Sequence, residues 1–157
     1  MQAIWKLRIY RESCAGLDGL GETGYLSTHA AQLARILGFQ GCWDEAADFL
    51  AMADRATNPG DMASLILCGS ARALILTHAG EHAQAELHAR EAVRLAETTD
   101  AIESHGHALL DLATVLESAG KQAEAAAATE AALRLFEQKE SAPMIARARE
   151  RLGALTV

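Results

Sequence analysis

The residues best suited to chemistry in this chain are His105, His107 and Asp111, which lie in one short segment. Imidazole and carboxylate groups are ligands for zinc. Only His107 and Asp111, at positions i and i+4, share one face of a helix, whereas His105 and His107 point apart. His78 and His82 are separated by a glycine turn. Two ligands on one face do not form a zinc site, so the sequence predicts no metal and no cofactor.

Hydrolytic chemistry would need a nucleophile, a base and an orienting acid that meet in a pocket. Ser104, Ser118, His107 and Asp111 supply these residue types, but no nucleophile elbow surrounds either serine. Such side chains are also common in helices without activity. We therefore expect that the chain is not an enzyme.

The cysteines offer a weaker chemical signal. Cys42 stands beside Trp43 at an expected helix start, where the pKa of a thiol can fall. Packing of both residues at a turn is the stronger interpretation. Cys14, Cys42 and Cys68 are odd in number and contain no C-x-x-C pair, which predicts reduced thiols that pack as small hydrophobic groups.

An internal repeat organises the elements that carry these residues. Three glycines recur at intervals of about 40 residues, each with a leucine four positions earlier. Alanines recur seven positions before and five positions after each glycine, where two helices of a hairpin would cross. The sets are Ala34, Leu37, Gly41 and Ala46; Ala73, Leu76, Gly80 and Ala85; and Ala113, Leu116, Gly120 and Ala125.

The pattern of each repeat predicts two amphipathic helices joined at its glycine. Glycine suits a turn that needs a positive φ. Asp100 with Glu103 resembles a capping box at a helix start. We predict eight helices in an all-α, right-handed α-solenoid that forms a single domain over 1–157. The expected helices span 3–17, 27–39, 43–57, 61–78, 81–98, 101–119, 121–139 and 142–155.

The expected domain organisation is an unpaired N-terminal helix within 1–20, hairpins over 27–57, 61–98 and 101–139, and a capping helix over 142–155. In the cap, Arg147, Arg149, Glu150 and Arg151 are expected to face outward. The first helix displays more apolar surface than one neighbouring helix would cover. We expect its exposed side chains to contact another domain or a second copy of the chain; they are Ile4, Trp5, Ile9 and Tyr10.

Charge and hydropathy limit the partners. The net charge is −7 and no block of Lys or Arg is present, so nucleic acid and anionic membranes are poor partners. Lys6 and Arg8 interrupt the first apolar stretch, which therefore lacks the pattern of a secretory signal. Arg72 interrupts the most apolar run, over 62–76. We expect a cytoplasmic protein.

The repeat resembles the tetratricopeptide repeat in a longer variant. The segments 21–28, 89–100 and 108–113 more closely resemble the C-terminal tetratricopeptide region of bacterial class III adenylate/guanylate cyclases and related signalling ATPase transcriptional regulators. This resemblance covers about 21–155 and implies a regulatory or scaffolding segment. No phosphate-binding G-x-x-x-x-G-K-[ST] motif is present.

The resemblance also implies that the first helix of each hairpin lines a concave groove. The expected function is a non-catalytic protein-protein interaction module that binds a protein or peptide segment there, with Arg35 or Glu117 orienting it. The alternatives are a sensor of a small molecule or peptide, and a self-associating module that forms a homodimer through its N-terminal helix. Groove candidates are Thr28, Arg35, Phe39, Leu67, Ser70, Leu74, His78, His107, Leu110, Asp111, Thr114 and Glu117.

Overall fold

The computed structural model describes the backbone of residues 2–155 and the side chains of residue 5 and residues 7–155. Within this range the chain forms eight helices and no strand, which confirms the predicted all-α fold. The helices are α1 (Gln2–Gly19), α2 (Thr23–Phe39), α3 (Trp43–Ala56), α4 (Met62–His78), α5 (His82–Glu97), α6 (Ile102–Ser118), α7 (Gln122–Gln138) and α8 (Ala142–Leu155).

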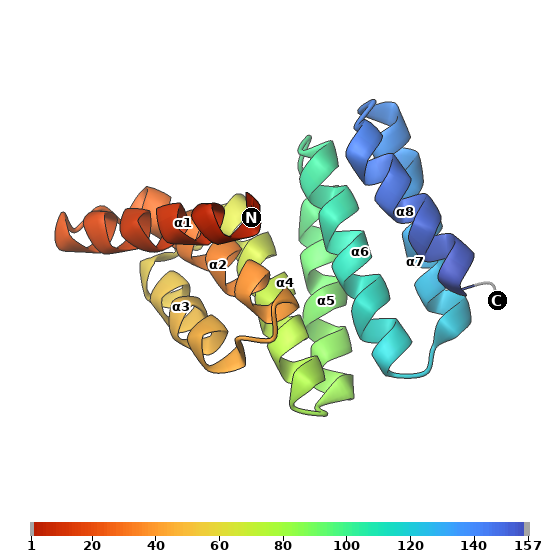
Figure 1. Cartoon of the computed structure of the whole chain (residues 1–157), viewed down its shortest axis with the longest axis horizontal. Coiled ribbons are helices and arrows are strands. Elements are labelled where there is room, and N and C mark those ends of the chain that lie inside the picture. Colours follow the sequence, from red (N-terminus) through yellow and green to blue (C-terminus); the bar gives the residue numbers. More distant parts are fainter. Residues whose placement is uncertain (1, 156–157) are drawn as a thin grey trace.

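The helices pack mainly on their neighbours along the chain. Helix α2 pairs with α3, α4 with α5, and α6 with α7, while α2 also packs on α4 and α4 on α6. Figure 1 shows these hairpins following one another from the red N-terminal helix to the blue C-terminal helix. The right-handed solenoid arrangement stays a prediction.

The recurring Leu-x-x-x-Gly pattern forms the turn inside each hairpin. Gly41, Gly80 and Gly120 have φ values of 77°, 81° and 75°, a region that side-chain-bearing residues rarely adopt. In each turn, the leucine that stands four positions before the glycine accepts a hydrogen bond at its carbonyl from the amide of the residue after the glycine. In the first hairpin, the Cys42 amide donates to the Leu37 carbonyl at 3.0 Å. This bond satisfies a carbonyl that the end of the helix leaves unpaired.

The same turn joins α1 to α2, which the sequence analysis missed. Gly21 has a φ of 67°, and the Glu22 amide donates to the Leu17 carbonyl at 3.0 Å. Helix α2 also begins at Thr23, four residues earlier than the expected start, because the Glu22 carboxylate accepts hydrogen bonds from the amides of Gly24 and Tyr25. An acidic side chain can replace the serine or threonine more usual at this position.

The predicted capping box at Asp100 and Glu103 is wrong. Helix α6 follows Ala101, whose side chain makes no capping bond. The Thr99 hydroxyl instead accepts a hydrogen bond from the Ala101 amide at 3.2 Å.

Small residues lie where helices approach one another. The six alanines that flank the hairpin glycines are all fully or almost fully buried. The core has two parts, one built from α1 to α4 and one from α4 to α8. Between α6 and α7, the ring of fully buried Phe136 lies so close to Gly106 that an added Cβ would come within 2.7 Å of it. The fit of these helices therefore depends on the absence of a side chain at Gly106.

We predict that Gly106→Ala lowers the free energy of unfolding by about 1–3 kcal/mol, because the methyl group overpacks a closed core. Urea denaturation followed by circular dichroism measures this. Gly16→Ala is the matched control, since a Cβ at Gly16 of α1 meets nothing within 4 Å and alanine favours helix. Equal stability of the two variants would contradict the packing argument.

Candidate functional site

The predicted groove residues divide into two hollows on the face formed by α2, α4 and α6. The first cavity has a volume of about 270 Å³, and the second hollow, one helical turn further along, has a volume of about 510 Å³. Six predicted residues line the first cavity: Thr28, Arg35, Leu67, Ser70, His107 and Asp111. Four line the second hollow: Phe39, Leu74, His78 and Thr114.

Two predicted groove residues have other surroundings. Leu110 is buried in the core of α4 to α8, so its side chain is not available to a partner and its prediction is corrected. The Glu117 carboxylate accepts a hydrogen bond from Arg151 of α8 at 2.7 Å. Glu117 is therefore already paired within the chain instead of being free to orient a partner.

A buried ion pair crosses this face. Arg35 of α2 donates through both Nε and Nη2 to the carboxylate of Asp111 of α6, with 2.8 Å between Nη2 and Oδ1. Arg35 is 8% and Asp111 1% exposed. Both helices pack on α4, and the two side chains meet across this face. The predicted role of Arg35 in orienting a partner is corrected, because its guanidinium binds this carboxylate.

Burial and the carboxylate of Asp111 have opposite effects on the pKa of Arg35. Desolvation lowers the pKa of the guanidinium, but the charge of Asp111 and the hydrogen bonds to it raise the pKa further, so that the net shift is upward. Arg35 is accordingly charged at any physiological pH. The bidentate geometry fixes both side chains relative to each other.

Helix α8 also reaches this face: Arg147 is exposed as predicted, but Arg151 is partly buried, contrary to the prediction that it faces outward. Arg151 donates to the Thr114 hydroxyl of α6 at 3.0 Å. The guanidinium of Arg147 lies 5.8 Å from the ring centroid of Phe39, and that of Arg35 lies 5.2 Å from it. Arginine is attracted to the face of an aromatic ring. These contacts connect α8 to α6 and α2.

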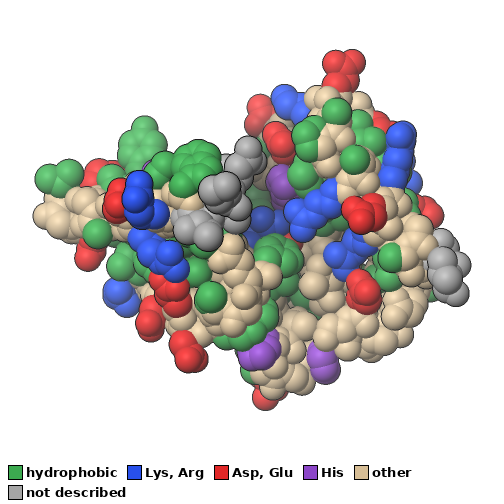
Figure 2. Space-filling view, viewed as in Figure 1, with side chains coloured by type: hydrophobic (Ala, Val, Ile, Leu, Met, Phe, Trp, Pro, Cys, Tyr) green, Lys and Arg blue, Asp and Glu red, His purple; other side chains and the backbone are tan. Residues whose placement is uncertain are grey.

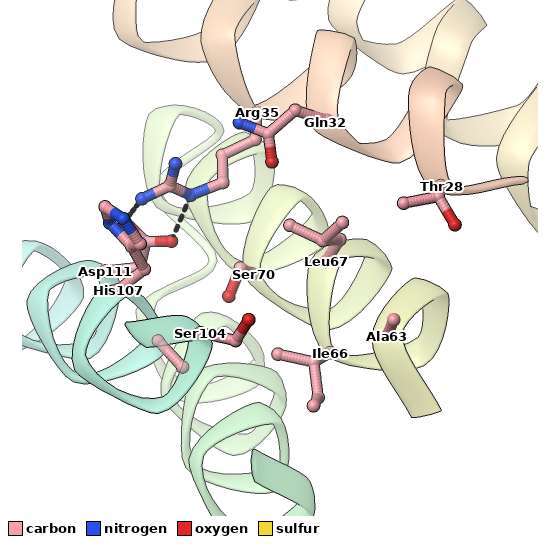
Figure 3. Close-up of a pocket in the computed structure, with 11 residues that line it drawn as sticks. Thr28, Gln32, Arg35, Ala63, Ile66, Leu67, Ser70, Ser104, His107 and Asp111 are labelled. Atoms are coloured by element: carbon pink, nitrogen blue, oxygen red, sulfur yellow. Dashed lines mark hydrogen bonds and ion pairs between the residues drawn. The ribbon is translucent and has the colours of Figure 1, made fainter. Parts of the chain in front are cut away.

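The first cavity combines polar and apolar walls (Figure 3). Ser70 comes from α4, Ser104 and His107 from α6, and Arg35 with Gln32 from α2. Gln32 was not predicted from the sequence, although it lies on α2 between Thr28 and Arg35. Apolar contact area is supplied by Ala63, Ile66, Leu67 and Ala108.

His107 is a neutral member of this cavity. Burial lowers the pKa of its imidazole, and the positive charge of Arg35 lowers it further, against the opposing effect of Asp111. Its ring packs edge-on against Phe136 with 5.5 Å between centroids. Its buried Nδ1 has no hydrogen-bond partner among the described residues.

The second hollow has aromatic walls. The rings of Trp43 and His78 stack with 4.3 Å between centroids and an interplanar angle of 9°. Phe39 is 44% exposed at the edge of the same hollow, and Leu74 lies beneath it. Large exposed aromatic groups are enriched where proteins bind partners.

The structure brings only some of the chemical candidates of the sequence together. No group of three or more His, Cys, Asp or Glu side chains in the described part of the chain could hold a metal ion. Ser104 lines the first cavity with His107 and Asp111, whereas Ser118 lines the second hollow. Cys14 and Cys68 are buried as expected, but Cys42 is exposed, so its predicted packing at the turn is wrong. Trp43 instead stacks on His78.

The N-terminal face carries exposed apolar residues. Trp5 and Ile9 are about half exposed, and with Tyr10, Ser13 and His29 they line a hollow of about 390 Å³. Figure 2 shows hydrophobic side chains gathered over the position of α1. The side chain of Ile4 lies outside the described residues. Whether this face mediates self-association stays a prediction.

Comparisons with known proteins show the fold and nothing finer. No protein-family model and no curated protein matches the chain. The structure is similar to the crystal structure of BtubC (BKLC) from P. vanneervenii, with a TM-score of 0.71 and 17% sequence identity. The match covers 99% of this chain and 66% of that one, so this chain spans slightly less than two thirds of its length. Within its described residues, no helix is long and apolar enough to span a bilayer.

We predict that Asp111→Ala lowers the free energy of unfolding by about 3–5 kcal/mol, because it leaves the buried guanidinium of Arg35 without a counter-charge. Urea denaturation measures the loss, and combining Asp111→Leu with Arg35→Met should recover most of it. Arg72→Ala, which removes the exposed pair with Asp54, is the control and should cost about 1 kcal/mol or less. Similar losses from Asp111→Ala and Arg72→Ala would show that burial of the bridge is not decisive.

We predict a pH dependence of stability from His107. Its pKa is lowered in the folded chain, so the unfolded chain, with a pKa of about 6.5, binds the proton first as the pH falls. The free energy of unfolding should therefore decrease from about pH 6.5 downward, through the lower pKa of the folded state. His107→Gln should reduce the difference between pH 7.5 and pH 5.5 in urea denaturation.

His88, whose pKa burial also lowers, provides the comparison. His88→Gln should remove a separate part of the same pH dependence, and the double variant should show the smallest difference. If the free energy of unfolding of His107→Gln depends on pH as strongly as that of the parent chain, the prediction is wrong.

Proposed function

We propose that this chain is a non-catalytic protein-interaction module whose α2–α4–α6 face binds a segment of a partner protein. One observation carries the proposal: two hollows lie side by side along this face, one with polar groups and one with aromatic walls. An extended or helical segment that crosses the face would meet both. The Arg35–Asp111 bridge keeps α2 and α6 in place and thereby presets the shape of the face.

Pre-organisation supports this function energetically. The bridge, the Arg151 contacts to Thr114 and Glu117, and the Arg147 contact to Phe39 hold the walls before a partner arrives. Less ordering entropy is then lost on binding. The resemblance of segments 21–28, 89–100 and 108–113 favours a role within a bacterial signalling regulator, and we propose a cytoplasmic location on the same basis.

A second candidate function is a sensor of a small molecule or peptide. The first cavity favours it, because three helices border a space of about 270 Å³ that contains buried polar groups. A ligand there would contact α2, α4 and α6 together. Binding could then change the curvature of the stack.

The interaction function is tested by selecting peptides from a random library displayed on phage, with the full chain as bait. We predict that Phe39→Ala lowers the affinity for the selected peptides about tenfold or more, as expected for removal of an aromatic group central to an interface. Isothermal titration calorimetry measures the dissociation constants. Leu87→Ala is the matched control, since Leu87 is 68% exposed on α5 and outside both hollows. Peptides that bind Phe39→Ala as tightly as the parent chain would refute the assignment of this face.

A further inference from the structure

Ser70 is a buried hydroxyl group without a partner. Its side chain is 2% exposed, and it borders the first cavity from α4. None of the described residues forms a hydrogen bond with it. The Nδ1 atom of His107, which lines the same cavity, is fully buried and has no partner among the described residues, and a buried polar group without a partner costs about 1–3 kcal/mol. The cavity therefore contains a position where a bound hydrogen-bonding group would be stabilised.

Other polar side chains border the same cavity as Ser70. Gln32 is half-buried and Ser104 is exposed, and both line the cavity with their polar groups free of bonds to other described residues. The buried Nδ1 of His107 also lacks a partner. Figure 3 shows these side chains arranged around one space, on three different helices. An amide and two hydroxyls offer both donors and acceptors.

The nearby hydroxyl network is a useful contrast. Ser27, Thr28 and Ser64, at the N-terminal ends of α2 and α4, bond to one another at 2.8–2.9 Å. Ser104 stands at the corresponding place on α6, three residues after the residue that precedes the helix, as Ser64 does on α4. Ser104 does not take part in such a network; it is exposed at the edge of the first cavity, so its hydroxyl can bond to a ligand.

The charges of the cavity exclude most ions. The guanidinium of Arg35 and the carboxylate of Asp111 both line it and neutralise each other. An anion would approach the carboxylate of Asp111, and a cation would approach the guanidinium of Arg35. Either would lose its hydration without a net opposite charge in return. A neutral hydrogen-bonding group avoids this cost.

We infer that the first cavity binds a single neutral carboxamide group, paired with Gln32 and the hydroxyls of Ser70 and Ser104. A carboxamide has one carbonyl acceptor and two N–H donors, so it can form two hydrogen bonds with the Gln32 amide and a third with a serine. The walls supplied by Ile66 and Leu67 would contact the methylene groups next to it. The inference deepens the proposed function, since a Gln or Asn side chain of the partner segment would supply this group.

Three probes of equal size and different charge test the inference. Propionamide, propionate and propylammonium are titrated into the ¹⁵N-labelled full chain at constant ionic strength, and amide shifts are followed by NMR. We predict saturable shifts for propionamide that concentrate on residues lining the first cavity. Propionate and propylammonium should bind at least about fivefold more weakly, the factor that one neutral hydrogen bond typically contributes. Equal or tighter binding of either ion, or no saturable shift with propionamide, would overturn the inference.

Variants assign the effect to the cavity. Gln32→Met keeps the side-chain length but removes the amide, and it should lower the affinity for propionamide about fivefold. Gln84→Met, at an exposed position of α5, is the matched control and should leave binding unchanged. Ser70→Ala should weaken propionamide as well, whereas Ser118→Ala, in the second hollow, should not. Unchanged binding in both Gln32→Met and Ser70→Ala would place the probe elsewhere.

The source of the carboxamide is distinguished by a capped glutamine, N-acetylglutamine methylamide. If the capped glutamine binds at least as tightly as propionamide, the carboxamide comes from a side chain of a partner segment. If propionamide binds but the capped glutamine does not, the ligand is a free small amide. If propionamide fails to bind but selected peptides depend on Phe39, the carboxamide site is wrong and the interaction function stands. If propionamide binds but no selected peptide depends on Phe39, the cavity assignment stands and the interaction function is wrong.

Discussion

The close approach of helices at alanine and glycine positions is the constraint on which this structure depends. Few aromatic side chains are present, so the core is filled by short side chains between closely spaced backbones. The alanines on both sides of each hairpin glycine are buried, and Gly106 leaves room for the ring of Phe136. Because close-packed interiors tolerate little added volume, larger side chains at these positions would force the helices apart. Stacking of these hairpins then brings α2, α4 and α6 onto one face.

The Arg35–Asp111 bridge joins two residues that lie 76 positions apart in the sequence. Each partner comes from a helix that packs on α4, and the pair joins α2 to α6 directly. Breaking it would leave a charge buried between apolar groups, which is far more costly than loss of a surface pair. The bridge therefore links stability to the shape of the binding face. It also neutralises the two strongest charges of the first cavity and so influences which ligands can enter.

The two hollows give the face different chemical character along its length. The first combines hydroxyl, amide and imidazole groups with apolar walls, and the second is aromatic, with Phe39 and the stacked Trp43 and His78. Arginines of α8 connect them by contacting Thr114, Glu117 and Phe39. Neutral polar recognition beside an aromatic anchor would favour a partner by its hydrogen-bonding pattern and its shape. Net charge would contribute less to such specificity.

The sequence by itself determined the all-α class, the eight helices and the glycine turns, because helical periodicity and the φ > 0 of a turn are local properties that residues 37–41, 76–80 and 116–120 express directly. Of the twelve groove candidates that it indicated, ten line one or the other of the two hollows. It did not predict that Arg35 binds Asp111, that Leu110 is buried, that Cys42 is exposed, or that Arg147 and Arg151 reach back to α2 and α6. Only the tertiary structure decided these points, since each depends on the angle at which helices distant in sequence meet, and helical spacing within one segment carries no information about that angle.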